Sequence, residues 1–210
     1  MPVLCLGLIT ISSCNLNAIH GSGVSKTETR AVSSFSKIDL LGSSDVQVSV
    51  GSDTSVAVTA DDNILAIIET TVEGDTLKID SKKSYSTSLG VKVNITVPAL
   101  NAVSISGSGD IQVTGLKTGD MDASITGSGN VTLSGVVDKL HGRILGSGDL
   151  RAGELAAKHV KVGVTGSGDA AVRAIEELDA SVTGSGDVRY SGSPPQVRRS
   201  VTGSGDIRPR

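Results

Sequence analysis

The chain has 210 residues and a formal net charge of −3, which suffices for one domain with a hydrophobic core or for two small ones. It has no Trp, one Phe and two Tyr, so the aromatic platforms on which nucleobases and sugars stack are nearly missing. No basic block points to nucleic acid, and 26 glycines accompany an ordinary apolar fraction. The composition argues against a nucleic-acid-binding protein and against a disordered chain.

The first fourteen residues resemble the signal peptide of a bacterial lipoprotein. Residues 3–11 are apolar, which is too short for a membrane span but fits the hydrophobic region of a signal peptide. The segment ends in Ile-Ser-Ser-Cys at Cys14, which resembles a lipobox with Ile at a position where Leu is usual. No Lys or Arg precedes it, so a plain secretory signal or a buried N-terminal strand is the alternative. We expect a lipoprotein signal peptide at 1–14 with lipidation of Cys14, followed by a linker at 15–28.

Residues 29–105 predict β-strands without a fixed period. Apolar and polar residues alternate in several segments of this region, as in strands that bury one face. Between two of them, Asp61 or Asp62 is placed to cap a short helical turn. We expect either wider first coils of a solenoid or a small cap sheet, because an uncovered first coil would be an unpaired edge.

From residue 106 onward, the motif Thr-Gly-Ser-Gly-Asp or a close variant occurs six times, at steps of 20, 19, 20, 18 and 19 residues. A worn copy, Gly-Ser-Ser-Asp, stands at 42–45. Alternating stretches follow and precede each motif, which indicates two half-buried strands per repeat. The fixed step predicts an all-β fold, a parallel β-helix or solenoid with coils of about 19 residues, wound right-handed as parallel crossovers generally are.

We interpret the motif as the sharp corner of each coil. Glycine permits a positive φ and close backbone packing. The serine hydroxyls would stack along the axis and hydrogen-bond one another, and the acid or amide would accept hydrogen bonds from its own turn. No ligand is needed to explain any position of this ladder, which comprises Gly107, Gly109, Asp110, Gly127, Gly129, Asn130, Gly146, Gly148, Asp149, Gly166, Gly168, Asp169, Gly184, Gly186, Asp187, Gly203, Gly205 and Asp206.

A row of carboxylates one coil apart also raises the question of calcium. The calcium-binding nonapeptide roll has two turns in every 18-residue coil and a doubled glycine, neither of which this chain has. Asn130 interrupts the row, and an Arg two residues after Asp149, Asp187 and Asp206 can neutralise it. We expect no metal and no cofactor. The histidines (His20, His141 and His159) follow no metal-ligand spacing, and the latter two are predicted to be exposed.

Three segments together resemble a known family. They read TRAVSSFSKIDLLGSSDVQVSVG, ADDNILAIIETTVEGDTLKI and VKVNITVPALNAVSISGSGDIQV, and they resemble the head GIN domain of autotransporter adhesins. The likeness covers residues 29–206, and we assign a domain to 29–210, with the N-terminal coils or cap at 29–105 and the repeat coils at 106–210. The resemblance implies a right-handed β-helix-like fold in secreted or lipid-anchored bacterial envelope proteins. It supplies no catalytic residues.

Two functions of different class are compatible with these observations. The first is a non-catalytic, adhesin-like binding or structural module that contacts an unknown glycan or protein through rows of Ser and Thr. The second is a β-helix polysaccharide lyase or hydrolase, although the clustered acids and aromatic groove of such enzymes are not apparent. We favour the first, with no nucleic-acid partner and with membrane contact only through the lipid. The protein is then an outer-membrane lipoprotein facing the periplasm or the surface, or otherwise a secreted protein.

The lipobox assignment is testable by metabolic labelling. Labelled palmitate should be incorporated into the wild-type chain and not into Cys14→Ala, because the lipid is attached through the sulfur of that cysteine. Asn15 is not the Asp that resembles an inner-membrane retention signal, so the labelled protein should fractionate with the outer membrane. Equal labelling of both proteins would contradict the assignment.

Overall fold

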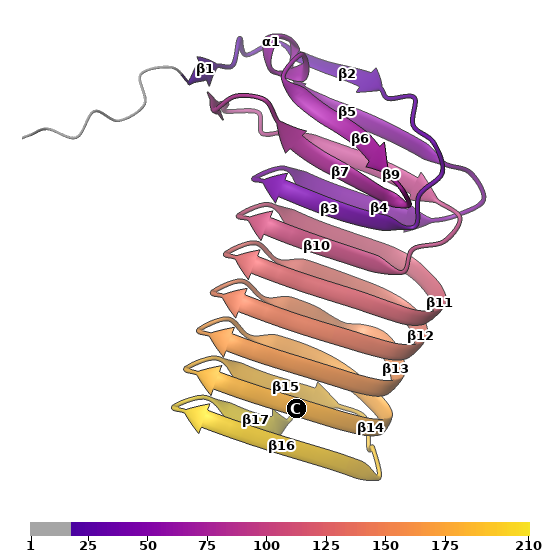
Figure 1. The fold of residues 1–210 in the computed structure, drawn as a ribbon, viewed down its shortest axis with the longest axis vertical. Coiled ribbons are helices and arrows are strands. Elements are labelled where there is room, and N and C mark those ends of the chain that lie inside the picture. The colour runs from indigo at the N-terminus through magenta and orange to yellow at the C-terminus, as the bar shows by residue number, and fades with distance from the viewer. Residues whose placement is uncertain (1–17) are drawn as a thin grey trace, which may run out of the picture.

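The computed structural model describes residues 18–210 as a stack of β-coils closed by a cap at its N-terminal end (Figure 1). The predicted parallel solenoid is confirmed, because strands one repeat apart pair in parallel through the whole repeat region. The elements are β1 (Ile19–His20), β2 (Ser25–Thr29), β3 (Lys37–Gly42), β4 (Asp45–Val50), β5 (Ser55–Asp61), α1 (Asp62–Leu65), β6 (Ile68–Glu73), β7 (Thr76–Ser81), β8 (Tyr85–Ser86), β9 (Lys92–Val97), β10 (Ala102–Gly107), β11 (Asp110–Gly127), β12 (Val131–Gly146), β13 (Leu150–Gly166), β14 (Ala170–Gly184), β15 (Asp187–Ser191), β16 (Gln196–Gly203) and β17 (Asp206–Pro209).

Each coil has two faces joined at a sharp corner. The long strands β11 to β14 cross one face, bend, and return across the other. We call the face that contains β3, β10, β16 and the C-terminal halves of the long strands the front sheet, which is nearer the viewer in Figure 1. The back sheet contains β4, β15, β17 and the N-terminal halves of the long strands β11 to β14. The corner motif joins the end of the front sheet to the start of the back sheet.

The core lies between the two sheets and is built from rows of identical or similar side chains. Alternate residues of each strand point inward and are buried, as the period of two requires. Because the coils are in register, each inward residue stacks on its equivalent one coil away. One such row on the front sheet comprises Leu40, Ile105, Ile125, Ile144, Val164 and Val182, each at most 1% exposed.

The backbone hydrogen bonds of each corner converge on one carbonyl oxygen. The carbonyl of the first glycine accepts the N–H of the serine and of the second glycine of the next coil, at 2.8–2.9 and 3.0–3.3 Å. The first glycine has φ between +122° and +142° in all six motifs, which turns its carbonyl toward the next coil. A side chain on it would overlap the corresponding carbonyl of the previous coil. Only glycine fits this position on both grounds.

The second glycine of each corner is required for a different reason. Its φ is not in the left-handed region, so backbone strain does not exclude a side chain there. At Gly168, however, a Cβ would overlap the carbonyl oxygen of Gly148 and would lie 3.1 Å from Cγ2 of Ile144 in the core. The same overlap recurs at the equivalent glycines of the other coils. The second glycine is therefore needed for close approach between coils.

The first coil is inserted out of chain order. Strand β3 pairs with β10 on one side and with β7 on the other, while β4 pairs with β11 and β9. The worn motif at 42–45 is thereby the first corner, since the Gly42 carbonyl accepts the N–H groups of Ser108 and Gly109 at 2.9 and 3.0 Å. Ser44 replaces the second glycine there. The coil above it is joined by the longer segment between β7 and β9, not by a Gly-Ser-Gly corner.

The cap covers the N-terminal end of the stack with antiparallel strands. β5 pairs with β9, and β2 pairs with β5, while β6 pairs with β7. Part of the expected linker, residues 19–20 and 25–28, therefore lies in strands β1 and β2. These residues of the predicted linker are ordered because β2 pairs with the backbone edge of β5, which would otherwise be unpaired.

Asp61 fastens this N-terminal segment to the cap. It occupies the N-cap position of α1 as predicted, but its side chain does not cap the helix. Instead the buried carboxylate accepts the Thr87 hydroxyl and, at 2.7 Å, the N–H of Gly23. The hydrogen bond from Thr87, with a further contribution from Gly23, holds the pKa of Asp61 below its usual range. The start of the described chain is thus fixed at the cap end of the solenoid.

The corner geometry predicts an unusual sensitivity to alanine. Gly168→Ala should lower the free energy of unfolding by about 2–4 kcal/mol, because one methyl group must separate two coils. Gly119→Ala is the matched control, since a Cβ there finds its nearest neighbour, Oδ2 of Asp138, at 4.0 Å. That substitution should change the free energy by about 0.5 kcal/mol or less. Urea denaturation of both variants measures the difference, and similar losses would contradict this account of the corner.

Candidate functional site

The acidic residue of each corner hydrogen-bonds the next coil and not its own turn, contrary to the sequence expectation. Oδ1 of each residue accepts the backbone N–H of its equivalent one coil further on. The distances are 2.9 Å from Asp110 to Asn130, 3.1 Å from Asp149 to Asp169 and 2.8 Å from Asp169 to Asp187. The amide that follows the acid is already engaged with the next coil, as where the N–H of Leu150 donates to the carbonyl of Asp169 at 2.9 Å. Asp206, in the last coil, instead accepts the N–H of Ile207 at 2.8 Å.

The ladder is also partly neutralised by arginine. Arg151 lies 3.0 Å from Asp149, and Arg189 lies 3.3 Å from Asp187. Asp169 has Ala171 at the equivalent position and so has no such pair. The remaining oxygens could in principle attract a cation, but within residues 18–210 no group of three or more His, Cys, Asp or Glu side chains is arranged to hold a metal ion. The contacts that the ladder makes along the axis are hydrogen bonds between coils.

The corner serines do not form the expected chain of hydroxyl bonds. All six side chains are exposed, and within residues 18–210 no hydrogen bond joins one of these hydroxyls to another. Their backbone N–H groups make the axial bonds instead, because the corner directs the amide inward and the side chain outward. The serines concerned are Ser108, Ser128, Ser147, Ser167, Ser185 and Ser204.

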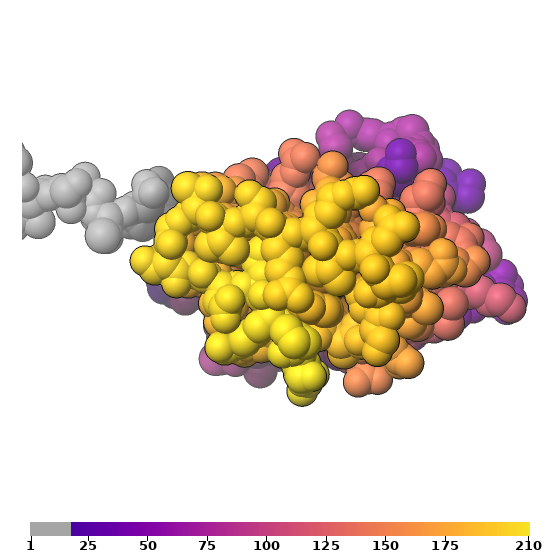
Figure 2. Space-filling view, turned by 90° about the horizontal axis from the view of Figure 1, so that it is seen from below, coloured from indigo at the N-terminus to yellow at the C-terminus, as the bar shows by residue number. Residues whose placement is uncertain are grey.

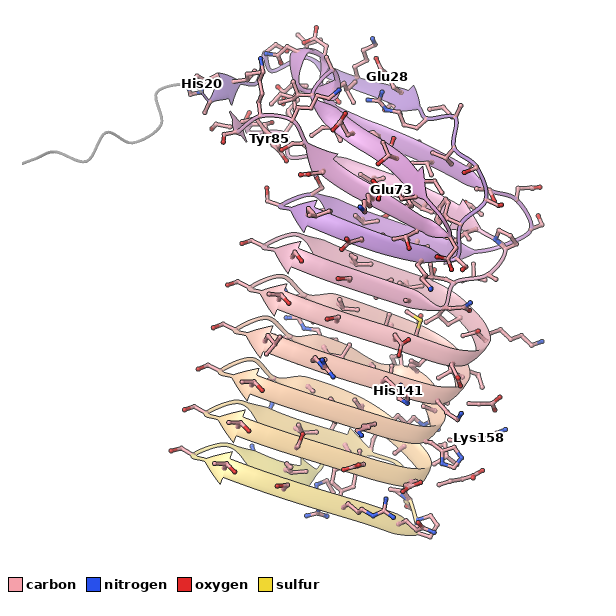
Figure 3. All side chains as sticks on the ribbon, in the orientation of Figure 1. His20, Glu28, Glu73, Tyr85, His141 and Lys158 are labelled. Atoms are coloured by element: carbon pink, nitrogen blue, oxygen red, sulfur yellow. The ribbon has the colours of Figure 1, made fainter. Side chains whose placement is uncertain are left out.

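Two of the three histidines lie where the chain turns onto the front sheet. His141 is on the outer surface of the coils (Figure 3), with Nδ1 3.3 Å from Asp122. His159 contacts Glu177 at 3.6 Å. Their positions are offset, since His141 is in register with Lys161, and His159 with Lys139. Both side chains are substantially exposed, as expected, and each lies beside a surface carboxylate.

The outer surface of the front sheet consists of three parallel rows. The row beside the corner is the predicted row of Ser and Thr hydroxyls, which Leu145 interrupts. At the cap end, Leu41 of β3 continues the same row. The second and third rows are more varied, and all three have one residue per coil at a spacing of about 4.8 Å. From the coil of β10 to that of β16, the row beside the corner reads Ser106, Thr126, Leu145, Thr165, Thr183 and Thr202, and the second reads Ser104, Ser124, Arg143, Gly163, Ser181 and Ser200.

A shallow groove of about 750 Å³ interrupts these rows at β11 to β14. Gly163 lines the groove, and the neighbouring coils carry Arg143 and Ser181 at the same position. Lys161 and Asp179 line the side remote from the corner. The sequence analysis missed this groove. The available signal was an Arg and then a Gly at an outward position that is Ser in the adjoining repeats.

Of the four arginines at the C-terminal end (Arg198, Arg199, Arg208 and Arg210), the first three contact other side chains of the chain. Arg199 lies over the ring of Tyr190, with Cζ 5.1 Å from the ring centroid, and also donates to the Tyr190 hydroxyl. Arg198 pairs with Glu177 at 2.6 Å, and Arg208 with Asp206 at 3.5 Å. Seen from this end, the last coil covers much of the stack (Figure 2). The Arg199–Tyr190 contact covers part of the lower end of the core, where Val197 and Val201 remain exposed, whereas Arg198 and Arg208 form surface ion pairs.

Two sequence-based assignments concern membrane attachment. Cys14 lies outside the residues that the structure describes. Among residues 18–210, no helix is long and apolar enough to cross a bilayer.

Comparison with known proteins gives a family and several solved structures. The family described as putative auto-transporter adhesin, head GIN domain, matches residues 34–194. A putative adhesin from Bacteroides fragilis is 29% identical, with a TM-score of 0.75 over 92% of this chain and 100% of that one. A putative lipid binding protein from Parabacteroides distasonis is 25% identical, with a TM-score of 0.61 over 92% and 99%. A putative adhesin from the same species, 22% identical with a TM-score of 0.64 over 92% and 100%, supports the fold alone. No curated protein matches the chain.

The ladder predicts different outcomes for two substitutions of one residue. Asp169→Asn should leave the free energy of unfolding within about 0.5 kcal/mol of wild type, because an amide oxygen still accepts the N–H of Asp187. Asp169→Ala should cost about 1 kcal/mol, since that half-buried N–H loses its partner. The melting temperature of the wild type should not respond to calcium or to EDTA. A rise of many degrees on adding calcium would instead establish a metal site.

Proposed function

The chain belongs to the head GIN domain family, and we propose that it is a non-catalytic adhesive module held at the bacterial cell envelope by a lipid on Cys14. The observation that carries the proposal is the outer surface of the front sheet. It is flat and largely polar, and the fixed strand register places one residue of each row in every coil. Such a surface supports many weak, evenly spaced contacts with an extended glycan or protein.

The shape of the molecule supports presentation of this surface away from a membrane. β1 and α1 lie at the cap end, and the last coil lies at the opposite end (Figure 1). Strand β12 is four strands from β7 in the stack, or roughly 20 Å at about 4.8 Å per strand. A lipid attached upstream of β1 would leave the front sheet of the repeat coils accessible.

The same surface offers little that would support turnover. Its groove is shallow, and its acids are spread along exposed rows without the desolvated pair of carboxyl groups that glycoside hydrolysis uses. Weak single contacts become effective when many copies share one membrane, because each contact after the first is intramolecular. Adhesion through multivalency is therefore the function that this geometry supports best, and a carbohydrate-active enzyme is the alternative.

Retention of cells tests the proposal. Bacteria that carry the full chain should be retained on a surface coated with an acidic polysaccharide or an envelope extract. Cells that express Cys14→Ala should not be retained, because that protein is released and binds as single copies. If both strains are retained no better than a strain that lacks the protein, the adhesive function is contradicted. Release of unsaturated or reducing ends from the polysaccharide would instead establish the enzyme.

A further inference from the structure

Gly163 creates a hollow that the fold does not require. Its φ is not in the left-handed region, and a Cβ built on it finds its nearest neighbour, Oγ of Ser181, at 3.3 Å. This is unlike the corner glycines, where a Cβ would overlap a backbone oxygen. Glycine weakens a strand interior, and where the backbone does not need it, it commonly marks close approach of a ligand or another chain. The missing side chain deepens the groove on the front sheet.

The cations that face this hollow are not committed to partners in the chain. Arg143 lies one coil before Gly163 in the second row. Lys161 lies two residues before Gly163 on the same strand, on the side remote from the corner. Within residues 18–210, neither side chain has a carboxylate within ion-pair distance, and neither donates a hydrogen bond. The adjacent basic side chains differ in this respect, since Lys139 lies 3.7 Å from Asp120 and Nδ1 of His141 lies 3.3 Å from Asp122. Arg143 therefore retains its five N–H donors for a ligand.

The other groups around the hollow suit a sugar. Asp122 and Asp179 offer carboxylate acceptors, and Ser124 and Ser181 offer hydroxyls that both donate and accept. Leu145, which is 43% exposed at the edge of the groove, offers an apolar surface for the C–H face of a ring. An adjoining hollow of about 300 Å³ shares Asp179 with the groove, so a longer chain can continue toward the bend side of the coils.

We propose that this groove binds an acidic polysaccharide, with Arg143 pairing with the carboxylate of one uronic-acid residue seated over Gly163. The inference rests on the adhesive function proposed above and names its ligand class. Arginine binds a carboxylate through two parallel hydrogen bonds, which fixes the orientation of the sugar. The two carboxylates of the groove accept hydrogen bonds from the hydroxyls of a uronate, whereas a sulfate ester has no hydrogen to donate to them.

Binding of two matched polymers by the full chain tests the proposal. The full chain, immobilised from detergent, is exposed to polygalacturonate and to the same polymer with its carboxyl groups reduced to alcohols. The wild type should bind the acidic polymer about tenfold more tightly, and Arg143→Gln should lose that preference. Arg173→Gln is the charge-matched control, because Arg173 is exposed on β14 away from the groove and forms no ion pair within residues 18–210. It should bind like the wild type.

Filling the hollow provides an independent test. Gly163→Val should weaken binding of polygalacturonate about tenfold, because the new side chain occupies the place of the sugar ring. Its melting temperature should be equal to or above that of the wild type, since a β-branched residue favours a strand and Ser181 can rotate away. Loss of binding together with retained stability separates recognition from folding. If the variant does not fold, Arg143→Gln alone decides the matter.

Several results would overturn the site. Equal loss of binding in Arg143→Gln and Arg173→Gln, or tighter binding of dextran sulfate than of polygalacturonate, would mean attraction by charge alone. Cells that bear Arg143→Gln and are still retained on polygalacturonate, as strongly as wild-type cells, would refute the groove but preserve adhesion. Retention that persists on a protein-coated surface and not on the polysaccharide would identify a protein partner instead. Wild-type cells that are retained on neither surface would refute the adhesive function itself.

Discussion

The structure depends on one contact, repeated at every corner, in which a glycine carbonyl accepts two N–H groups from the next coil. The contact works only if two glycines lack side chains. The first must take a positive φ to direct its carbonyl along the axis, and the second must let the next backbone approach. A coil that meets both conditions is held at a fixed height and rotation relative to its neighbour. The register of the repeat coils follows from this constraint.

Fixed register is what converts a repeated sequence into ordered rows. Inward residues form continuous apolar rows, so no coil buries its hydrophobic face alone. Outward residues form the rows of the front sheet, where one altered repeat is enough to make a local feature. Arg143 and Gly163 are such alterations in two adjacent coils, with serines at the same position in the coils on either side. A solenoid can in this way keep a uniform core while changes in two adjacent repeats form a groove on its surface.

The repeat region could be predicted from the sequence because its determinants are local and periodic. The step of about 19 residues, the alternation and the two glycines are all readable without knowledge of distant contacts. Four features were not predicted, and each involves partners distant in the sequence. The coil of β3 and β4 inserts between strands that follow it in the chain. Asp169 bonds the amide of another coil, β2 pairs with β5, and the groove combines four strands.

Hydrogen exchange of the corner amides tests the central role of this contact most directly. Corners are loops by sequence, and the amides of exposed loops normally exchange by local opening at small free energies. In this protein, the amides of Ser167 and Gly168 should exchange only with global unfolding, and at the same free energy as the core amide of Val164. Exchange of Ser167 and Gly168 at loop rates while Val164 remains protected would contradict the account, because the coils would then be held together without the corner bonds.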